Sequence, residues 1–258
     1  MMSRNRRLQL LARVDEAGLA SVGTLARDLD VSPSTIRRDL ARLAADGALV
    51  RTYGGAAAGA VLAGRDGLDP RLASKRAIGA LAADLVVDGQ TITISSGTTA
   101  LEFARCLVDR RLTVITNALD VVGVLLDRPG IELVVLGGVV RPGMHSMLGH
   151  LAELVLRELR ADALFMGIGA LSAERGLMND AIPEILTDRA LRHASGKCIV
   201  LADSSKLGAV APAFVFGAEE VDTLVTDSEG DPRQIAALEA CGMRVLVAAT
   251  SERSTSPT

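Results

Sequence analysis

The sequence predicts an α/β protein with a small, mainly helical N-terminal domain and a larger domain built around a mostly parallel sheet. Apolar residues recur at helical spacing over roughly the first 55 residues, and short apolar runs alternate with amphipathic segments thereafter. Charge divides at the same point. Residues 1–56 hold nine arginines and six acidic residues, a net charge of +3, whereas the remainder holds 19 basic and 25 acidic residues, a net charge of −6. A basic N-terminal segment followed by an acidic remainder is typical of a nucleic-acid-binding module joined to a different kind of domain.

Composition excludes several other classes of protein. Hydrophobic residues make up 49% and charged residues 23%, as in ordinary globular proteins. Aromatic residues make up only 2%, which argues against single-strand nucleic-acid binding on stacked rings. With no signal-peptide pattern and no apolar run of about 18 residues, we expect a cytoplasmic protein that does not engage membranes. Cys106, Cys198 and Cys241 match no metal-ligand spacing, so we expect buried thiols and no metal or cofactor.

The N-terminal domain is predicted to contain three short helices and a β-ribbon. Ser21 is placed to cap the second helix, and Ser32 followed by Pro33 is a strong start signal for the third. The helices are expected over Arg4–Ala17, Val22–Asp30 and Pro33–Asp46. Ala48–Tyr53, followed by Gly54 and Gly55, is too short for a helix and is expected to form a ribbon that turns on the glycines.

This order of elements is that of a winged helix-turn-helix, in which the third helix enters the major groove of DNA. Ile36, Leu40 and Leu43 would face inward, leaving hydroxyls and two arginines at the start of the helix to contact bases and phosphates. An isolated pair of arginines is usually only a solvated helix face, but the capped helix and the glycine turn favour DNA binding. The expected DNA-contacting residues are Ser32, Ser34, Thr35, Arg37, Arg38, Arg51, Tyr53 and Gly54.

The larger domain is expected at residues 74–250, after a DNA-binding domain at 1–57 and a linker at 58–73, with a flexible tail at 251–258. An Ala/Gly-rich stretch without periodicity, residues 57–67, suggests the linker. Strands are expected at Thr91–Ile94, Leu112–Thr116, Ile131–Leu136, Ala163–Gly167, Cys198–Ala202, Thr223–Thr226 and Arg244–Ala248. Helices are expected at Ser74–Leu85, Thr99–Arg110, Ala118–Asp127, Gly149–Leu159, Ile182–Ala194 and Pro232–Ala240. This alternation favours a parallel sheet flanked by helices.

The best ligand site in the larger domain is the segment Ser95–Thr99, which follows a predicted strand and opens a helix. Backbone N–H groups at a helix start, together with hydroxyl donors, can hold a phosphate, although such residues often serve only as caps. Ligands of open α/β sheets bind at the carboxyl ends of strands, where Asn117, Gly138 with Arg141, and Lys206 are also expected. For Asn117 the alternative is a loop cap, and for Gly138 it is a turn with positive φ.

Residues 31–56, VSPSTIRRDLARLAADGALVRTYGGA, resemble the DNA-binding signature of DeoR-type bacterial transcription regulators. The likeness lies in the serine-threonine start, the Ile-Arg-Arg-Asp-Leu core and the Tyr-Gly-Gly-Ala end. It implies that Arg37 and Arg38 contact operator DNA, and that the wing around Arg51–Gly55 lies against the DNA backbone or minor groove.

Lys75–Ser228 resembles the sensor domain of the same family, whose fold is similar to ribose-phosphate isomerases and coenzyme A transferases. The resemblance implies a phosphorylated-sugar effector held by a phosphate loop and its neighbours. The implied residues are Lys75, Ser96, Gly97, Thr98, Thr99, Asn117, Gly138, Arg141, Glu184 and Lys206. The chain departs from the family pattern at Ser95, where aspartate is usual, and at Asp188, where lysine is usual. We expect Arg189 to substitute in part for that lysine.

The resulting hypothesis is a homo-oligomeric repressor, a dimer or tetramer, that binds double-stranded operator DNA near a sugar-catabolism operon and leaves it when the effector binds. The alternative is an isomerase- or transferase-like enzyme fused to a DNA-binding module. In that case Glu184 and Asp203 would be the acid and base, and His145 or His193 would titrate near neutrality. A third hypothesis is an architectural DNA-binding protein without a ligand. We expect no catalysis, because the sequence contains no arrangement of a nucleophile with a base.

Overall fold

The computed structural model describes residues 6, 7, 9, 10, 13, 14, 19–45, 49–52, 55–58, 69–141 and 143–249, with the backbone alone at 19, 44, 45, 49–52 and 55–58. The chain divides into two compact units, Met1–Leu68 and Asp69–Thr258. The expected tail, 251–258, lies outside the described residues. So do Tyr53, Gly54 and most of the expected linker.

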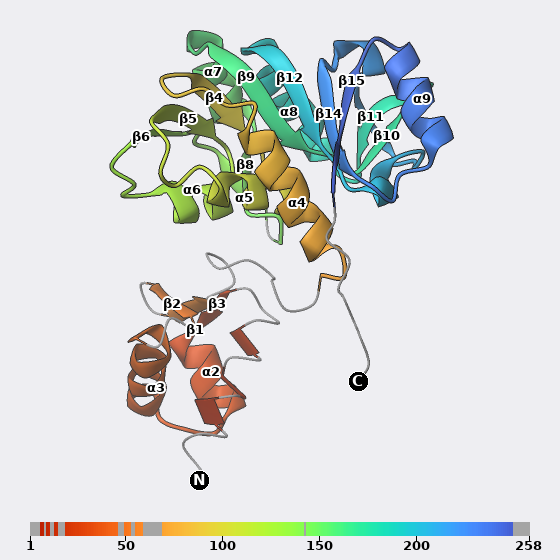
Figure 1. Ribbon diagram of the computed structural model, residues 1–258. Coiled ribbons are helices and arrows are strands. Elements are labelled where there is room, and N and C mark those ends of the chain that lie inside the picture. The colour runs from red at the N-terminus through yellow and green to blue at the C-terminus, as the bar shows by residue number, and fades with distance from the viewer. Residues whose placement is uncertain are drawn as a thin grey trace, which may run out of the picture. The chain divides into compact units, whose positions relative to one another are not determined.

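The N-terminal unit contains the predicted helices and a small antiparallel sheet (Figure 1). Its elements are β1 (Leu19–Ser21), α2 (Val22–Asp28), α3 (Pro33–Ala45), β2 (Leu49–Thr52) and β3 (Gly55–Ala58). The described residues of the expected first helix, 6, 7, 9, 10, 13 and 14, are also helical. Leu10 and Val14 pack with apolar side chains of α2 and α3, so the three helices share one core.

The sheet of this unit differs from the predicted ribbon. β3 lies between β1 and β2 and is antiparallel to both. Ala58, which we assigned to the linker, therefore belongs to the middle strand. β1 was not predicted, because three residues directly before a helix carry too little pattern to identify a strand.

The larger unit is built on seven parallel strands in the order β15-β14-β12-β9-β4-β5-β6. The strands are β4 (Thr91–Ile94), β5 (Leu112–Thr116), β6 (Ile131–Val135), β9 (Ala161–Gly167), β12 (Ser195–Leu201), β14 (Thr223–Asp227) and β15 (Arg244–Ala248). All seven were predicted within a few residues, since buried parallel strands are continuous apolar runs. The chain adds β5 and β6 on one side of β4, then returns to add β9 on the other. The direction of winding therefore reverses between β4 and β9.

Six helices cover the two faces of this sheet. They are α4 (Leu72–Ala83), α5 (Thr98–Arg105), α6 (Leu119–Leu125), α7 (His150–Glu158), α8 (Ile185–His193) and α9 (Pro232–Ala240). Side chains of α4, α5 and α6 pack on one face around Phe103 and Phe165, whose rings stack with centroids 4.3 Å apart. Side chains of α7, α8 and α9 belong to the core on the other face. The fold is thus a three-layer, doubly wound α/β domain.

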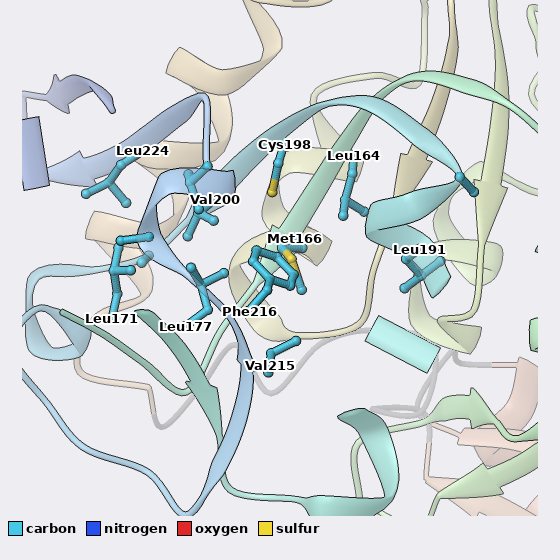
Figure 2. Packing of buried hydrophobic residues seen from close by; sticks show 14 of the residues in the cluster. Leu164, Met166, Leu171, Leu177, Leu191, Cys198, Val200, Val215, Phe216 and Leu224 are labelled. Atoms are coloured by element: carbon cyan, nitrogen blue, oxygen red, sulfur yellow. The ribbon is translucent and has the colours of Figure 1, made fainter. Parts of the chain in front are cut away.

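A small antiparallel sheet, β10-β11-β13, completes the second core. Its strands are β10 (Ala170–Ser172), β11 (Gly176–Asn179) and β13 (Ala213–Phe216). Figure 2 shows Leu171, Leu177 and Phe216 of this sheet gathered with Met166 of β9 and Val200 of β12. A further hairpin pairs β7 (Val139–Arg141) with β8 (Ser146–Leu148). We predicted none of these five strands, which are only three or four residues long.

Several predicted boundaries and one burial prediction were wrong. α5 ends at Arg105 rather than Arg110, and α4 begins at Leu72 rather than Ser74. The helix expected at Ile182–Ala194 opens with a 3₁₀ turn, η2 (Ile182–Glu184). Two further 3₁₀ turns are η3 (Ser204–Lys206) and η4 (Ala218–Glu220). Cys198 is buried as predicted, but Cys106, just after the end of α5, is exposed, and Cys241 is only partly buried.

Candidate DNA-binding surface and effector site

The start of α3 is fixed by hydroxyl groups. The Oγ of Ser32 accepts a hydrogen bond from the backbone N–H of Thr35 at 3.2 Å, which caps the helix as the sequence predicts. The same oxygen lies 2.9 Å from the hydroxyls of Ser34 and of Thr35. Ser32 and Ser34 remain exposed, so hydroxyls are available at the helix end that would meet bases.

Arg37 and Arg38 are exposed on α3, while Ile36, Leu40 and Leu43 are buried, as predicted. Within the described part of the chain, neither arginine side chain forms an ion pair or hydrogen bond. Of the wing residues, Arg51 lies in β2 with only its backbone described, and Tyr53 and Gly54 lie outside the described residues. Their contacts with DNA stay predictions.

Asp39 is a structural residue of α3 that we did not single out from the sequence. Its side chain is only 4% exposed and accepts a hydrogen bond from Nε of Arg6 at 2.7 Å. The pair joins α3 to the first helical segment of the chain, which contains Arg6. The helix that carries Arg37 and Arg38 is therefore held from its inner side. An acidic residue between arginines and a leucine gave no sign of this role, because its partner lies 33 residues away.

The loop Ser95–Thr99 lies where the winding of the sheet reverses, between the carboxyl ends of β4 and β9. Ser95 donates its backbone N–H to the carbonyl of Phe165, and its Oγ accepts the N–H of Gly167. Gly97 precedes α5 with φ of 121°, a conformation that disfavours side chains. The predicted phosphate loop therefore occupies the position where doubly wound sheets bind ligands.

Lys75 on α4 reaches this loop. Its Nζ donates to Oγ1 of Thr98 at 2.9 Å and to the Asp69 carboxylate at 2.5 Å. Thr98 is exposed and Thr99 is buried, whereas Ser96 is intermediate. The structure thus brings an ammonium group to the start of α5, as an anion site requires. Asp69 was missed in the sequence, although Asp69-Pro70 before a helix is a start signal of the same kind as Ser32-Pro33.

A second group of predicted residues meets around Glu184, at the end of η2. Its Oε1 accepts from the Oγ of Ser146 at 3.0 Å and from Nη1 of Arg141 at 2.8 Å. Asn117 joins the group through the neighbouring residue, since its Nδ2 donates to the carbonyl of Met147. The Oδ1 of Asn117 is buried and has no hydrogen-bond partner among the described residues. A buried acceptor without a partner is uncommon in folded proteins, so this position is a candidate for a functional role.

Asp188 lies one helical turn beyond Glu184 and is also buried. Its Oδ2 accepts from Nδ2 of Asn179 at 2.6 Å. Burial, reinforced by the nearby Glu184 charge, raises the pKa of Asp188 to about 7 even though the Asn179 bond lowers it. Arg189 does not take the place of a lysine here, because its guanidinium donates to the carbonyls of Val215 and Phe214 in β13.

The remaining predicted residues have local roles or no contact with these groups. Gly138 has φ of 137°, and a side chain there would overlap the carbonyl of Leu148, so it allows the β7–β8 hairpin to close. Lys206 lies in η3, where its backbone N–H donates to the carbonyl of Asp203. Asp203 itself caps η3 through Ser205. His145 pairs with Asp120 at 3.0 Å, and His193 is exposed. Across the described residues, no His, Cys, Asp and Glu cluster could hold a metal ion.

Comparison with known families agrees with both halves of the chain. Residues 6–59 match the model of the DeoR-like helix-turn-helix domain, and residues 71–228 match that of the DeoR C-terminal sensor domain. The chain belongs to the DeoR family. It is a DNA-binding transcription regulator of that family rather than an enzyme.

Relatives of this DeoR-family regulator match over nearly their whole length. The HTH-type transcriptional regulator GolR of Listeria innocua is 32% identical over 251 residues, covering 94% of this chain and 98% of GolR. A putative aga operon transcriptional repressor of Escherichia coli is also 32% identical over 251 residues, covering 94% and 93%. The transcriptional repressor AccR of Agrobacterium fabrum is 32% identical over 232 residues, covering 88% and 90%.

Similar solved structures include ribose 5-phosphate isomerases. That of Methanocaldococcus jannaschii matches with a TM-score of 0.38 at 20% identity over 51% of this chain and 52% of the isomerase. That of Neisseria gonorrhoeae matches with a TM-score of 0.39 at 18% identity, covering 51% and 52%. Such partial matches say nothing about the chemistry of the DeoR-family chain. Among its described residues, no helix is long and apolar enough to cross a bilayer.

Proposed function

We propose that this regulator represses a sugar-catabolism operon as a homo-oligomer, and that a phosphorylated sugar bound at the Ser96–Thr99 loop releases it from its operator. The observation that carries the proposal is the contact of Lys75 Nζ with Thr98 Oγ1. This contact brings an ammonium group next to the hydroxyls and the unbonded N–H groups at the start of α5. That place is where the winding of the sheet reverses and where doubly wound sheets bind ligands.

The Glu184 group supplies the other end of the proposed site. Carboxylate, guanidinium and amide groups on Glu184, Arg141 and Asn117 can bond the hydroxyls of a sugar, while the loop binds its phosphate. A polar ligand with an anionic end and a hydroxyl-bearing body matches both groups. Lys206 stays a predicted contact from a neighbouring strand end.

The effector proposal is tested by thermal denaturation with a panel of phosphorylated sugars and their unphosphorylated counterparts. A ligand at 100 times its Kd should raise Tm by about 5–10 °C in a protein of this size. Thr98→Val should abolish the shift. Thr113→Val should retain it, because Thr113 pairs with Thr91 at the amino-terminal end of β4, away from the loop that follows its carboxyl end. If no phosphorylated sugar raises Tm, or if the sugar without phosphate is as effective, the proposal is wrong.

The DNA proposal is tested by electrophoretic shift with the upstream region of the operon that contains the gene. Arg37→Ala should weaken binding about 5- to 150-fold, the loss of one bidentate base contact. Arg42→Ala is the matched control, because Arg42 is an exposed arginine in the last turn of the same helix. Equal binding by Arg37→Ala and wild type would rule out the assignment of α3 as the reading helix.

Repression and oligomer size are tested together. In vitro transcription should fall when the protein is added and recover with the effector, while light scattering should give a dimer or tetramer. Two DNA-binding units would double the base contacts, as specific operators generally require. If transcription rises when the protein alone is added, the protein is an activator and the proposed repression is wrong.

A further inference from the structure

The ammonium group of Lys75 already holds an anion from its own chain. Besides its bond to Thr98, it forms an ion pair with Asp69 Oδ2 at 2.5 Å. Both side chains are largely covered, with Lys75 13% and Asp69 19% exposed. An ammonium group has three donors, so the loop and this carboxylate share the same cation.

Asp69 is held in place by the backbone as well as by Lys75. Its Oδ1 accepts the N–H of Arg71 at 2.9 Å, and its carbonyl accepts the N–H of Leu72 at 3.1 Å. Burial alone would raise the pKa of Asp69, but the bonds from Lys75 and Arg71 outweigh it and hold this pKa below its ordinary value. The carboxylate is therefore ionised at neutral pH and partly neutralises Lys75.

We propose that Asp69 is a specificity-determining residue that competes with the ligand for Lys75 and restricts the loop to doubly charged anions. This inference rests on the proposed effector function of the same loop. A carboxylate ligand carries no more charge than Asp69 and gains little by replacing it. A phosphate monoester carries about −1.5 to −2 at pH 7, which attracts the shared cation more strongly than Asp69 does.

The position of Asp69 also makes it able to report that the loop is occupied. It is the first residue of the second unit, directly after the stretch 59–68 that follows β3. The next charged residue, Arg71, is anchored elsewhere, because its Nη1 donates to Ser204 Oγ at 2.9 Å and contacts Glu229 at 3.4 Å. When phosphate draws Lys75 away, Arg71 keeps α4 in place, and Asp69 loses its ion pair but keeps the hydrogen bond from the backbone N–H of Arg71. The loss of the ion pair therefore occurs at Asp69, the residue of the second unit that is nearest in sequence to the DNA-binding unit.

The test is the affinity of the full-length protein for inorganic phosphate and for acetate, measured by isothermal titration calorimetry at pH 7.5. Asp69→Asn keeps the Oδ1 acceptor for Arg71 and removes the charge. It should tighten phosphate binding about three- to tenfold and acetate binding by a larger factor, so that discrimination between the two narrows. Asp88→Asn is the matched control, since Asp88 precedes β4 at the far end of the strand and pairs with Arg110. It should change neither affinity.

A second readout is operator affinity without ligand, which Asp69→Asn should lower by a few fold and Asp88→Asn should leave unchanged. Circular dichroism melts verify that each variant is folded. If wild type binds phosphate but Asp69→Asn binds it equally or more weakly, Asp69 only positions Lys75 and the inference is wrong while the effector site stands. If wild type binds neither phosphate nor any phosphorylated sugar, both the inference and the proposed function fail.

Discussion

The two proposed binding surfaces differ in whether their charged groups are already paired within the chain. On α3, Arg37 and Arg38 are exposed and have no ion-pair partner among the described residues. In the sensor, Lys75 is bonded to Asp69, and Arg141 is bonded to Glu184. The first surface can bind any phosphate backbone by displacing counterions, whereas a ligand of the second must replace internal partners. In the function proposed above, general affinity and selective response therefore belong to different units.

This contrast predicts opposite effects of mutation. Substituting an unpaired, exposed residue should change binding with little effect on stability, and substituting a paired, buried residue should change stability first. The following four substitutions test that rule, from the largest expected effect to the smallest.

Asp188→Asn should show the largest effect, and its size should depend on pH. The folded-state pKa of Asp188, about 7, lies above the ordinary value of 3.8, so the folded protein binds this proton more tightly than the unfolded chain. Protonated Asp188 therefore stabilises the fold fully below about pH 4. This contribution to the free energy of unfolding, about 4 kcal/mol, is lost as the pH rises through 7. Asparagine does not titrate, so the advantage of the variant over wild type should grow across this window. Urea denaturation at pH 4.5, 6 and 8 measures it, and a constant difference would contradict the assignment.

Gly138→Ala should destabilise the protein by about 3 kcal/mol. The backbone has φ of 137° there, and a Cβ would overlap the Leu148 carbonyl across the hairpin that carries Arg141. Gly137→Ala is the control, because a Cβ at Gly137 meets nothing within 4 Å. Urea midpoints compare the two. Equal losses of stability in the two variants would mean that the β7–β8 hairpin adjusts freely to the added Cβ. Arg141, which this hairpin carries, would then not be held rigidly in its pairing with Glu184.

Asp39→Ala should cost about 2 kcal/mol in the DNA-binding unit, since it removes the buried partner of Arg6. Arg38→Ala, the neighbouring position on α3, should stay within about 0.5 kcal/mol of wild type. Thermal denaturation monitored by circular dichroism distinguishes them. A stability loss in Arg38→Ala as large as in Asp39→Ala would erase the distinction between paired and unpaired residues on this helix.

Ser146→Ala should show the smallest effect, about 1 kcal/mol, because Glu184 loses one hydrogen bond and keeps Arg141. The hydroxyl is fully buried, so its loss also leaves a small void. Ser205→Ala, at an exposed position in η3, is a comparison from the same unit. Guanidinium denaturation measures both, and a change below about 0.3 kcal/mol for Ser146→Ala would show that Arg141 alone satisfies Glu184.

The fold was predictable where burial leaves a long pattern. The seven strands of the parallel sheet are apolar runs such as Ile131–Val135, bounded by turns, and the start of α3 carries an explicit Ser-Pro signal. Strands such as β7 and β8 are paired three-residue segments, and their alternation is too short to distinguish from a loop. Their pairing depends on Gly138 and on contacts formed only after folding.

The candidate site was predictable where it follows local rules and not where it depends on distant pairing. Ser96–Thr99 and Asn117 lie at strand ends, so the topology rule places them. Asp69, Ser146 and Asn179 escaped notice because their partners lie 6, 38 and 9 residues away and follow no short motif. Arg189 was expected to substitute for the lysine that is usual in the family at position 188, but its guanidinium bonds carbonyls of β13 instead.

The middle position of β3 determines how firmly the sheet of the DNA-binding unit holds this strand. β3 is bonded along both sides, to β1 and to β2. Force along β3 would load both ladders of backbone bonds in shear, whereas an edge strand is held by one ladder alone. Among the described strands of this unit, β3 is therefore the one that cannot separate without breaking both pairings of the sheet.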